Sequence, residues 1–413
     1  MLSMKNKLSG LGRSGYLKKI AAGLLIFTGG LAVKGCKTAP PASQGPLFES
    51  TVVFEPKEGL YSSTRIPALV VTKKGSLLAF CVGRINSASD WADMDLLMRR
   101  STDGGKTWGE YTVVAPRQDG KPTDNPTPIV DDKGTVHLLY QRDYARAYYT
   151  SSDDDGQTWS PAKDITATFE AFKPEYPWKV LAPGPGHGIQ LKNGRLLAPV
   201  WLADSDKLTP HRSHRPSAIA TVYSYDLGKT WKRGAIVANN SPEFKNPSET
   251  MALQLEDGRV MLNIRNETAV RRRGVAYSPD GISNWTKVTF DEALFEPIVM
   301  GSIIRISGKD QGEKSRLLFV NPDSRHIEKH PRKNLTAKLS YDEGRTWPVQ
   351  KVINPGVSGY SDLALGPDGT IYCLYETHSG AKGAQYRLVL QRFNLEWLTG
   401  GKDKGAKNKA LAQ

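Results

Sequence analysis

Short runs of alternating apolar and polar residues, each interrupted by a turn that contains glycine, recur along the chain. Alternation with a period of two is typical of β-strands that bury one face. Asn-Gly or Asp-Gly between two such runs is a strong hairpin signal. The predicted hairpins are Ala68–Cys81, Thr127–Tyr140, Gly188–Trp201, Ala252–Arg265 and Leu363–Glu376, with a sixth at Ser302–Val320 whose turn is enlarged by residues 308–314.

A second repeat, the octet S-x-D-x-G-x-T-W, alternates with the hairpins. Complete copies begin at Ser101, Ser152, Ser224 and Ser340, and a worn copy at Ser278 keeps only Asp280 and Trp285. Asp and Gly supply the hydrogen bonds and the positive φ of a tight turn, while Ser and Thr bond the local backbone. Four complete copies indicate a repeat fold in which each repeat is one supersecondary unit.

A third strand precedes each octet or its worn copy. The predicted third strands are Asp95–Arg100, Ala145–Thr150, Ala218–Tyr223, Gly274–Tyr277 and Asn334–Leu339. Two hairpins make a four-stranded antiparallel blade, and six blades in series predict an all-β, six-bladed β-propeller. The last unit lacks an octet, and Arg387–Phe393 would supply its third strand. Pairing Thr51–Glu55 into that blade would close the ring and hide an exposed edge.

The N-terminus differs from the rest of the chain. Basic residues from Lys5 to Lys19 precede the apolar run Ile20–Val33, and Cys36 follows a glycine. This pattern is typical of a secretory signal with a lipoprotein-type cysteine; an uncleaved N-terminal anchor is the alternative. We expect an export signal at 1–36, a linker at 37–46, the propeller at 47–400 and a basic flexible tail at 401–413. The protein would be periplasmic, on the cell surface or secreted, touching a membrane only through a lipid anchor at Cys36.

Charge and cysteine content narrow the choice of partners. The 413-residue chain has a net charge of +14, of which the leader through Lys34 contributes six and the tail after Gly401 three, so the body carries +5. This mild excess does not call for nucleic acid and suits an anionic substrate. Cys81 and Cys373 lie in apolar runs, which favours buried free thiols over a disulfide. No cysteine–histidine spacing suggests zinc, and we expect a monomer without metal or organic cofactor.

Several ionisable residues lie in the connections just outside the predicted hairpins. In a propeller, connections at one face of the central channel converge, so these side chains could meet. Taken singly, an arginine near a strand end is an ordinary surface or salt-bridge residue, and a tyrosine in a loop is an ordinary packed ring. Their joint pattern is more informative. The residues concerned are Arg65, Asp90, Glu249, Arg265, Arg332, Tyr360 and Glu376. Asp95 lies near Asp90 but starts the predicted strand Asp95–Arg100, so we expect it to be structural. We expect the arginine run 271–273, beyond Arg265, to be solvated surface.

These residues stand in motifs that resemble those of a known family. The motifs are R-I-P at Arg65, G-R-x-N-S-x-x-D through Asp90, G-P-G-H-G-I-Q-L from Gly184, Y-S-D-L from Tyr360 and C-L-Y-E at Glu376. From about Phe54 to Glu376 the chain resembles exo-α-sialidases (neuraminidases) of the six-bladed kind, which carry the octet as the Asp-box or BNR repeat. The octet also occurs in propellers with other activities, so the other motifs carry the resemblance.

The resemblance implies how a substrate would be bound. Arg65, Arg265 and Arg332 match the three arginines that grip the substrate's carboxylate, because guanidinium groups pair with carboxylates through two parallel hydrogen bonds. Glu376 matches the acid that holds Arg65 in place. Two further residues match positions that touch the sugar's outer substituents, Arg84 and Asn125. The expected partners are sialylated glycans.

The resemblance also implies a catalytic mechanism. Tyr360 matches the nucleophile and Glu249 its base, since a phenol with its ordinary pKa of about 10 needs a carboxylate to take its proton. Asp90 matches the general acid/base. We therefore expect a retaining exo-α-sialidase that acts through a tyrosyl-glycoside intermediate, an exception to the two-carboxylate rule for glycosidases.

Three alternatives remain open. Thr250 and Met251 replace the cysteine and glutamine frequent in the family, so the same fold could hydrolyse or transfer another nonulosonic acid. A catalytically silent propeller that binds glycans is the second alternative. A peptidase or lyase-like propeller is the third, and no Ser-His-Asp order or metal cluster in the sequence supports it.

Overall fold

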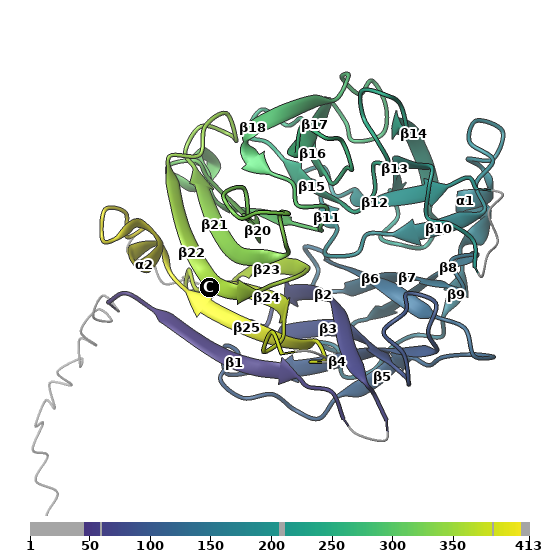
Figure 1. The fold of residues 1–413 in the computed structure, drawn as a ribbon, viewed down its shortest axis with the longest axis horizontal. Coiled ribbons are helices and arrows are strands. Elements are labelled where there is room, and N and C mark those ends of the chain that lie inside the picture. Colours follow the sequence, from purple (N-terminus) through teal and green to yellow (C-terminus); the bar gives the residue numbers. More distant parts are fainter. Residues whose placement is uncertain (1–44, 58–59, 206–210, 382–383, 406–413) are drawn as a thin grey trace, which may run out of the picture. The chain divides into compact units, whose positions relative to one another are not determined.

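A computed structural model describes residues 45–57, 60–205, 211–381 and 384–405. Within these ranges the chain forms six antiparallel sheets arranged in a ring, as in a six-bladed β-propeller (Figure 1). The predicted fold class is therefore confirmed. The predicted export signal, Cys36 and most of the linker and tail lie outside the described residues.

The first three blades are built in chain order, each from its innermost to its outermost strand. Blade 1 contains β2 (Ser63–Val71), β3 (Leu77–Arg84), β4 (Met94–Ser101) and β5 (Thr112–Ala115). Blade 2 contains β6 (Thr123–Val130), β7 (Val136–Arg142), β8 (Arg146–Ser152) and β9 (Lys163–Asp164). Blade 3 contains β10 (Val180–Pro183), β11 (Ile189–Gln190), β12 (Leu196–Ala203), β13 (Ser217–Ser224) and β14 (Lys232–Asn239), and the short helix α1 (Thr166–Glu170) precedes it.

The next three blades follow the same plan. Blade 4 contains β15 (Thr250–Gln254), β16 (Val260–Ile264), β17 (Arg272–Ser278) and β18 (Thr289–Phe295). Blade 5 contains β19 (Ser302–Ser307), β20 (Arg316–Pro322), β21 (Lys333–Ser340) and β22 (Val349–Val357), with the 3-10 turn η1 (Lys309–Gln311) in its first hairpin. Blade 6 contains β23 (Ser361–Leu365), β24 (Ile371–Thr377), β25 (Arg387–Phe393) and β1 (Phe48–Phe54), and α2 (Leu395–Thr399) ends the fold.

The ring closes through a strand from the start of the chain. β1 pairs antiparallel with β25, in a register that sets Phe48 opposite Phe393 and Phe54 opposite Leu388. Figure 1 shows the purple β1 beside the yellow β25. This pairing confirms the predicted closure, which protects β25 from being an exposed edge.

Blade 3 departs from the predicted plan of one inner hairpin. Its innermost position is shared by β10 and β11, which both pair with β12. The segment between them contains Gly184 and Gly186, both with positive φ, and Pro185, which has no N–H to donate to a ladder. The backbone therefore leaves the sheet for a few residues and returns to it.

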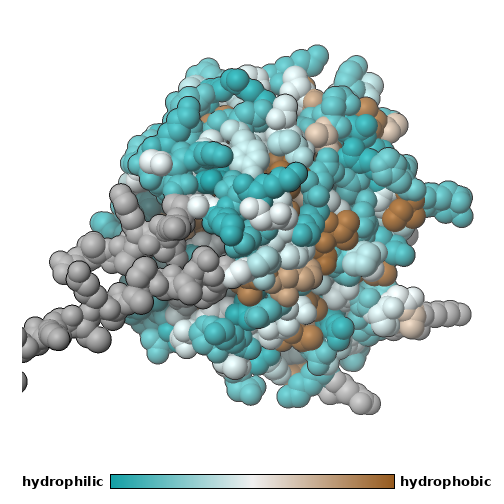
Figure 2. Space-filling model, turned by 90° about the vertical axis from the view of Figure 1, so that its left-hand side faces the viewer, coloured by the Kyte–Doolittle hydropathy of each residue, from teal (hydrophilic) through white to brown (hydrophobic). Residues whose placement is uncertain are grey.

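Six clusters of buried apolar side chains lie between neighbouring blades. Between blades 1 and 2, for example, Leu78 and Phe80 of β3 pack with Leu138 and Tyr140 of β7. The face in Figure 2 is largely hydrophilic, with hydrophobic residues in small groups. The buried apolar residues therefore lie between the blades and stabilise their packing. Cys81 and Cys373 belong to these clusters as buried free thiols, as predicted.

The octets form the turns between the third and fourth strands of their blades. In the first copy, Asp103 accepts hydrogen bonds from the backbone N–H of Lys106 and Thr107 and from the hydroxyls of Thr107 and Ser101. The N–H of Gly105 donates to Ser101 Oγ at 2.9 Å. The predicted tight turn is confirmed, and it lies at the face opposite the connections that carry the ionisable residues.

No helix in the described part of the chain is long and apolar enough to cross a membrane.

Candidate active site

The antiparallel order of the strands brings the predicted residues to one face of the ring. Each blade's first strand starts at this face and its second strand ends there. Arg65 lies near the start of β2 and Glu376 near the end of β24, while Glu249 and Tyr360 immediately precede β15 and β23. Six of the nine predicted residues line one pocket of about 210 Å³: Arg65, Asp90, Glu249, Arg265, Arg332 and Tyr360.

Tyr360 and Glu249 form the closest pair in this pocket. The Tyr360 hydroxyl donates to Glu249 Oε1 at 2.5 Å, and Arg265 Nη1 donates to Glu249 Oε2 at 2.6 Å and to Tyr360 Oη at 2.7 Å. Burial acts to raise the pKa of Glu249, but Arg265 and the Tyr360 hydroxyl outweigh it and hold that pKa below its ordinary value. Burial raises the pKa of Tyr360 well above 10, and Glu249 adds to the rise. At neutral pH a protonated phenol therefore faces an ionised carboxylate.

Three arginines surround the ring of Tyr360. The guanidinium carbons of Arg65, Arg265 and Arg332 lie 5.7, 5.9 and 5.5 Å from its centroid. Arg332 Nη2 donates to the carbonyl of Ile298 at 2.7 Å, and no ion pair involves Arg332 among the residues described. Three guanidinium groups that converge on a polar pocket can bind a carboxylate through paired hydrogen bonds.

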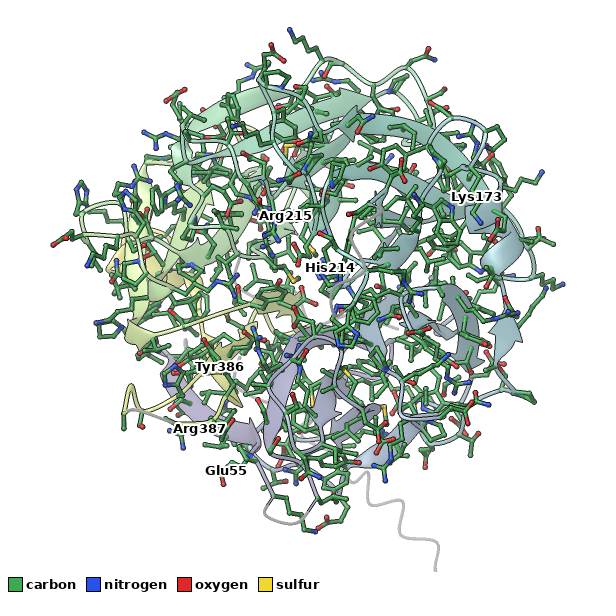
Figure 3. The ribbon with its side chains drawn as sticks, turned by 45° about the vertical axis from the view of Figure 1, so that its right-hand side comes forward. Glu55, Lys173, His214, Arg215, Tyr386 and Arg387 are labelled. Atoms are coloured by element: carbon green, nitrogen blue, oxygen red, sulfur yellow. The ribbon has the colours of Figure 1, made fainter. Side chains whose placement is uncertain are left out.

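Glu376 lies behind Arg65 and is fully buried. Its carboxylate accepts from Arg65 Nε at 3.2 Å and Arg65 Nη2 at 3.0 Å, and from the backbone N–H of Ile66 at 2.9 Å and Tyr360 at 3.1 Å. The ring of Tyr386 covers the same guanidinium, with 4.7 Å between its centroid and the guanidinium carbon. Figure 3 labels Tyr386 next to Arg387. Glu376 therefore orients the Arg65 guanidinium and fixes the backbone of Tyr360 through a hydrogen bond.

Asp90 lies in the β3–β4 connection with its side chain half exposed. Arg84 Nη2 donates to Asp90 Oδ1 at 2.8 Å. Burial acts to raise the pKa of Asp90, but the charges of Arg84 and Arg65 outweigh it and hold the pKa below its ordinary value. Nearby, burial raises the pKa of Asp124 to about 6, against the opposing charge of Arg84.

Arg84 and Asn125, the two residues expected to touch the sugar's outer substituents, do not line the pocket. Arg84 is fully buried, so it supports Asp90 from behind. Asn125 is 4% exposed and has a positive φ of 62° at the start of β6. Asp95, predicted to be structural, is buried and accepts from the Tyr61 hydroxyl at 2.8 Å.

Several further residues line the pocket, mostly from blades 3 and 4, and were not identified from the sequence. Arg215 donates to the carboxylate of Glu267, with 2.8 Å from its Nε to either oxygen. Asn246 Nδ2 donates to Glu267 Oε2 at 2.9 Å. Five of these residues stand in connections and three near strand ends at the same face, which is the signal that could have identified them. The missed residues are Ile66, Trp201, His214, Arg215, Ser217, Asn246, Ser248 and Glu267.

Asp362 of the Y-S-D-L motif joins distant segments near the central channel. It accepts from the backbone N–H of Leu69 in blade 1 at 2.9 Å and from Ser302 Oγ in blade 5 at 2.8 Å. The ring of His187, from the G-P-G-H motif, lies 2.7 Å from Asp362 Oδ1. Both motifs therefore stabilise the ring of blades, and Tyr360 lies two residues from this junction.

One sequence-based interpretation was wrong. The run 271–273 was expected to be solvated surface, but Arg273 is fully buried. Its Nη1 donates to Glu296 Oε2 at 2.6 Å and its Nε to Asn263 Oδ1 at 2.7 Å. A charge can be buried when a carboxylate and further acceptors pair with it.

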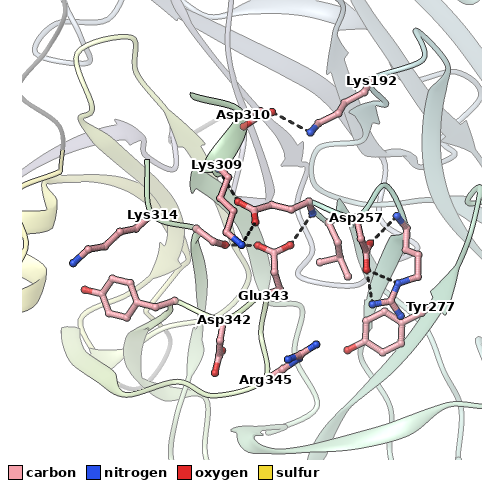
Figure 4. A pocket seen from close by; sticks show the side chains of 14 residues that line it. Lys192, Asp257, Tyr277, Lys309, Asp310, Lys314, Asp342, Glu343 and Arg345 are labelled. Carbon is pink, nitrogen blue, oxygen red and sulfur yellow. Dashed lines mark hydrogen bonds and ion pairs between the residues drawn. The ribbon is translucent and has the colours of Figure 1, made fainter. Parts of the chain in front are cut away.

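A larger cavity of about 1100 Å³ lies at the octet face, between the turns of blades 4 and 5 (Figure 4). Its charges pair mostly with one another, as in the Arg259–Asp257 ion pair at 2.7 Å and the Lys192–Asp310 pair at 3.0 Å. Among the described residues, no group of three or more His, Cys, Asp or Glu side chains is placed to hold a metal ion.

Comparisons with known proteins identify relatives of this chain. A family model described as a BNR repeat-like domain matches residues 75–373. The chain is 34% identical to a sialidase of Micromonospora viridifaciens, over 87% of this chain and 56% of that protein. It is 33% identical to a sialidase of Bacteroides fragilis, over 76% of this chain and 60% of that protein. The chain thus spans little more than half the length of these two relatives.

Two further matches cover more of the related protein. Mouse Sialidase-2 is 31% identical over 80% of this chain and 93% of its own length. The solved structure of the Hadza microbial sialidase Hz136 superposes with a TM-score of 0.69 at 28% identity, over 84% of this chain and 69% of that one. On these matches, together with the fold, the chain belongs to the sialidase family.

Proposed function

We propose that this protein is an exo-acting glycoside hydrolase that releases terminal α-linked sialic acids from glycans, with retention of configuration and through a tyrosyl-glycoside intermediate. The observation that carries the proposal is the Tyr360–Glu249 hydrogen bond of 2.5 Å inside a pocket lined by three arginines. The named sialidases among the relatives support the substrate class.

In the first half-reaction the substrate's carboxylate binds the three arginines. Tyr360 Oη attacks the anomeric carbon while Glu249 accepts the phenolic proton. Asp90 donates a proton to the glycosidic oxygen, the bond from that oxygen to the anomeric carbon breaks, and the aglycone alcohol leaves. The sugar is then bound covalently to Tyr360.

In the second half-reaction Asp90 accepts a proton from a water molecule, and the water oxygen attacks the anomeric carbon from the face that the aglycone left. The bond to Tyr360 breaks, and the phenolate recovers its proton from Glu249. Two displacements at one carbon retain its configuration. A tyrosine suits this substrate because the anomeric carbon carries a carboxylate, which would repel an anionic Asp or Glu nucleophile.

In the free protein the pKa of Asp90 lies below its ordinary value, whereas a proton donor must be protonated when the substrate is bound. Arg65 is one of the charges that lower this pKa. When the substrate's carboxylate pairs with Arg65, it offsets that positive charge, so the pKa of Asp90 rises in the complex. Substrate binding itself would thus favour the protonated form that the first step requires.

The test is to replace the nucleophile. Tyr360→Phe keeps the packed ring and removes the hydroxyl, so we expect kcat on an aryl α-sialoside to fall at least about a thousandfold. Tyr372→Phe is the matched control, because Tyr372 lies in β24 with its hydroxyl near the octet residue Gly104. The anomer released first, followed by proton NMR, reports the stereochemistry.

Substantial activity in Tyr360→Phe, or first release of the inverted anomer, would contradict the mechanism. Free sialic acid as the product distinguishes hydrolysis from transfer to an acceptor. A folded wild type that binds sialic acid without turnover would favour the silent glycan-binding alternative. We also propose export directed by residues 1–36 and a monomeric state. Cell fractionation, with Cys36→Ala as the variant that cannot be lipidated, tests the localisation.

A further inference from the structure

His214 is a histidine of the active-site pocket that the mechanism above does not use. It stands in the β12–β13 connection of blade 3 and lines the pocket beside Trp201. Figure 3 shows it next to Arg215, near the middle of the ring of blades. Its imidazole is enclosed by three aromatic rings, with centroid distances of 4.6 Å to Tyr144, 5.2 Å to Trp201 and 5.5 Å to Trp91. This packing holds the imidazole in one orientation.

The Nε2 atom of this imidazole is shielded from solvent and has no hydrogen-bond partner among the described residues. Buried polar atoms are nearly always paired, because leaving one unpaired costs stability. The indole Nε1 of Trp201 is unpaired in the same way. The Nε atom of Arg265, another residue of this pocket, is also unpaired. Three unpaired nitrogens on residues that line one pocket indicate that a ligand supplies missing partners.

The electrostatics favour a neutral imidazole. Burial lowers the pKa of His214, against the opposing charges of Asp90 and Glu249, while Arg215 and Arg265 act in the same direction as burial. A neutral imidazole has one donor nitrogen and one acceptor nitrogen. A hydroxyl group can both donate and accept, so it can pair with Nε2 in either tautomer.

The position of blade 3 identifies which part of the ligand would reach His214. The three arginines that would hold the carboxylate come from blades 1, 4 and 5, and Tyr360 comes from blade 6. In a ring of six, blade 3 stands opposite blade 6 (Figure 1). A sugar acid held by its carboxylate and attacked from blade 6 therefore extends its other ring substituents towards blade 3. The polyhydroxylated side arm, on the carbon beside the ring oxygen, is one of them.

We propose that His214 is a specificity-determining residue, whose Nε2 hydrogen-bonds a hydroxyl group on the side arm of the bound sugar acid. The proposal rests on the proposed function. Trp91, Tyr144 and Trp201 position the imidazole, and the pairing satisfies a nitrogen that is unpaired in the free protein.

The experiment compares two substrates and three variants. The substrates are an aryl α-sialoside with its intact three-carbon side arm and the same compound with the arm shortened by periodate oxidation and reduction. His214→Phe keeps an aromatic ring in the enclosure and removes the nitrogen, whereas His214→Gln keeps a hydrogen-bonding group. His211→Phe is the matched control, because the His211 ring is exposed and stacks on Trp91 at 5.1 Å.

We expect wild type to prefer the intact substrate by about tenfold in kcat/KM, the effect of one hydrogen bond. His214→Phe should lose about tenfold on the intact substrate and little on the shortened one, so that the preference disappears. His214→Gln should recover part of it, and His211→Phe should behave as wild type. Equal losses on both substrates in His214→Phe, or an unchanged preference, would overturn the proposal.

Failure of the His214 proposal can also be distinguished from failure of the proposed function. If folded wild type cleaves neither substrate, the proposed hydrolysis is wrong, and calorimetry with free sialic acid then tests His214 alone. About tenfold weaker binding to His214→Phe than to wild type would support the hydrogen bond. Equal affinity, or no binding to either protein, would overturn it.

Discussion

Replacing Glu376 by glutamine should destabilise the fold and weaken substrate binding together. The carboxylate has two donors on each oxygen: Arg65 Nε and the Ile66 N–H on Oε1, and Arg65 Nη2 and the Tyr360 N–H on Oε2. A glutamine side chain offers one acceptor oxygen, so in either orientation its NH₂ group faces two donors. Two hydrogen bonds to a charged group are lost, at about 1.5–3 kcal/mol each.

The expected loss is therefore about 3–6 kcal/mol in the free energy of unfolding, a large share of the roughly 5–15 kcal/mol that stabilises a typical protein. Arg65 would also lose the partner that aims its guanidinium, so we expect KM for an aryl α-sialoside to rise at least about tenfold. Urea unfolding at pH 7 measures the first effect, and steady-state kinetics under conditions where the variant is still folded measures the second.

Glu55→Gln is the matched control for this substitution. Glu55 and Arg387 form an ion pair at 3.3 Å on the surface, where the side chains are 60% and 45% exposed. Figure 3 labels both residues. Exposed ion pairs contribute about 0–1 kcal/mol, so this variant should unfold and turn over as wild type does. A Glu376→Gln protein that loses under about 1 kcal/mol and keeps its KM would refute the reasoning.

Two further predictions concern titrating carboxylates. Arg84 helps to hold the pKa of Asp90 below its ordinary value. Arg84→Met should therefore raise that pKa and move the alkaline limb of the pH profile of kcat/KM to higher pH. An unmoved limb would contradict the assignment of Asp90 as the proton donor. Hydrogen bonds from Thr158 lower the pKa of the octet residue Asp154 to about 2, below its unfolded value of about 4. Its stabilising effect is thus complete above about pH 4 and is lost as the pH falls towards 2. Urea midpoints at pH 7, 4 and 3 should therefore fall less steeply for Asp154→Asn than for wild type, and parallel curves would contradict this.

The fold could be predicted from local patterns because each blade repeats them. Alternation of apolar and polar residues with glycine turns located the inner hairpins, and the predicted strand Arg387–Phe393 is β25. The interruption of blade 3 could not be predicted from alternation, since the segment between β10 and β11 reads Gly-Pro-Gly-His-Gly and has no alternating apolar and polar residues. Arg273 was misjudged for a similar reason: its burial depends on Glu296, whose approach only the folded blade reveals.

The site was predictable to the extent that chain topology brings residues together. Strand ends and connections at one face supplied Arg65, Glu249 and Tyr360, and an antiparallel propeller makes such positions converge. The direction in which a side chain points is a different matter. Arg84 ends the second strand of its blade and Arg265 directly follows the second strand of its own, yet the Arg84 guanidinium donates to Asp90 and is fully buried. The sequence pattern does not indicate in which direction such a side chain points.

The balance of charge around Tyr360 accounts for an anionic ligand and a neutral nucleophile in one pocket. Arg65 pairs with Glu376 and Arg265 with Glu249, whereas Arg332 has no carboxylate partner among the described residues. The group therefore keeps one positive charge in excess, which a single substrate carboxylate would neutralise. An ionised Asp in place of Tyr360 would cancel that charge before the substrate arrived and would repel it at the anomeric carbon. A protonated phenol adds no charge, and Glu249, already ionised beside Arg265, can take its proton when attack begins.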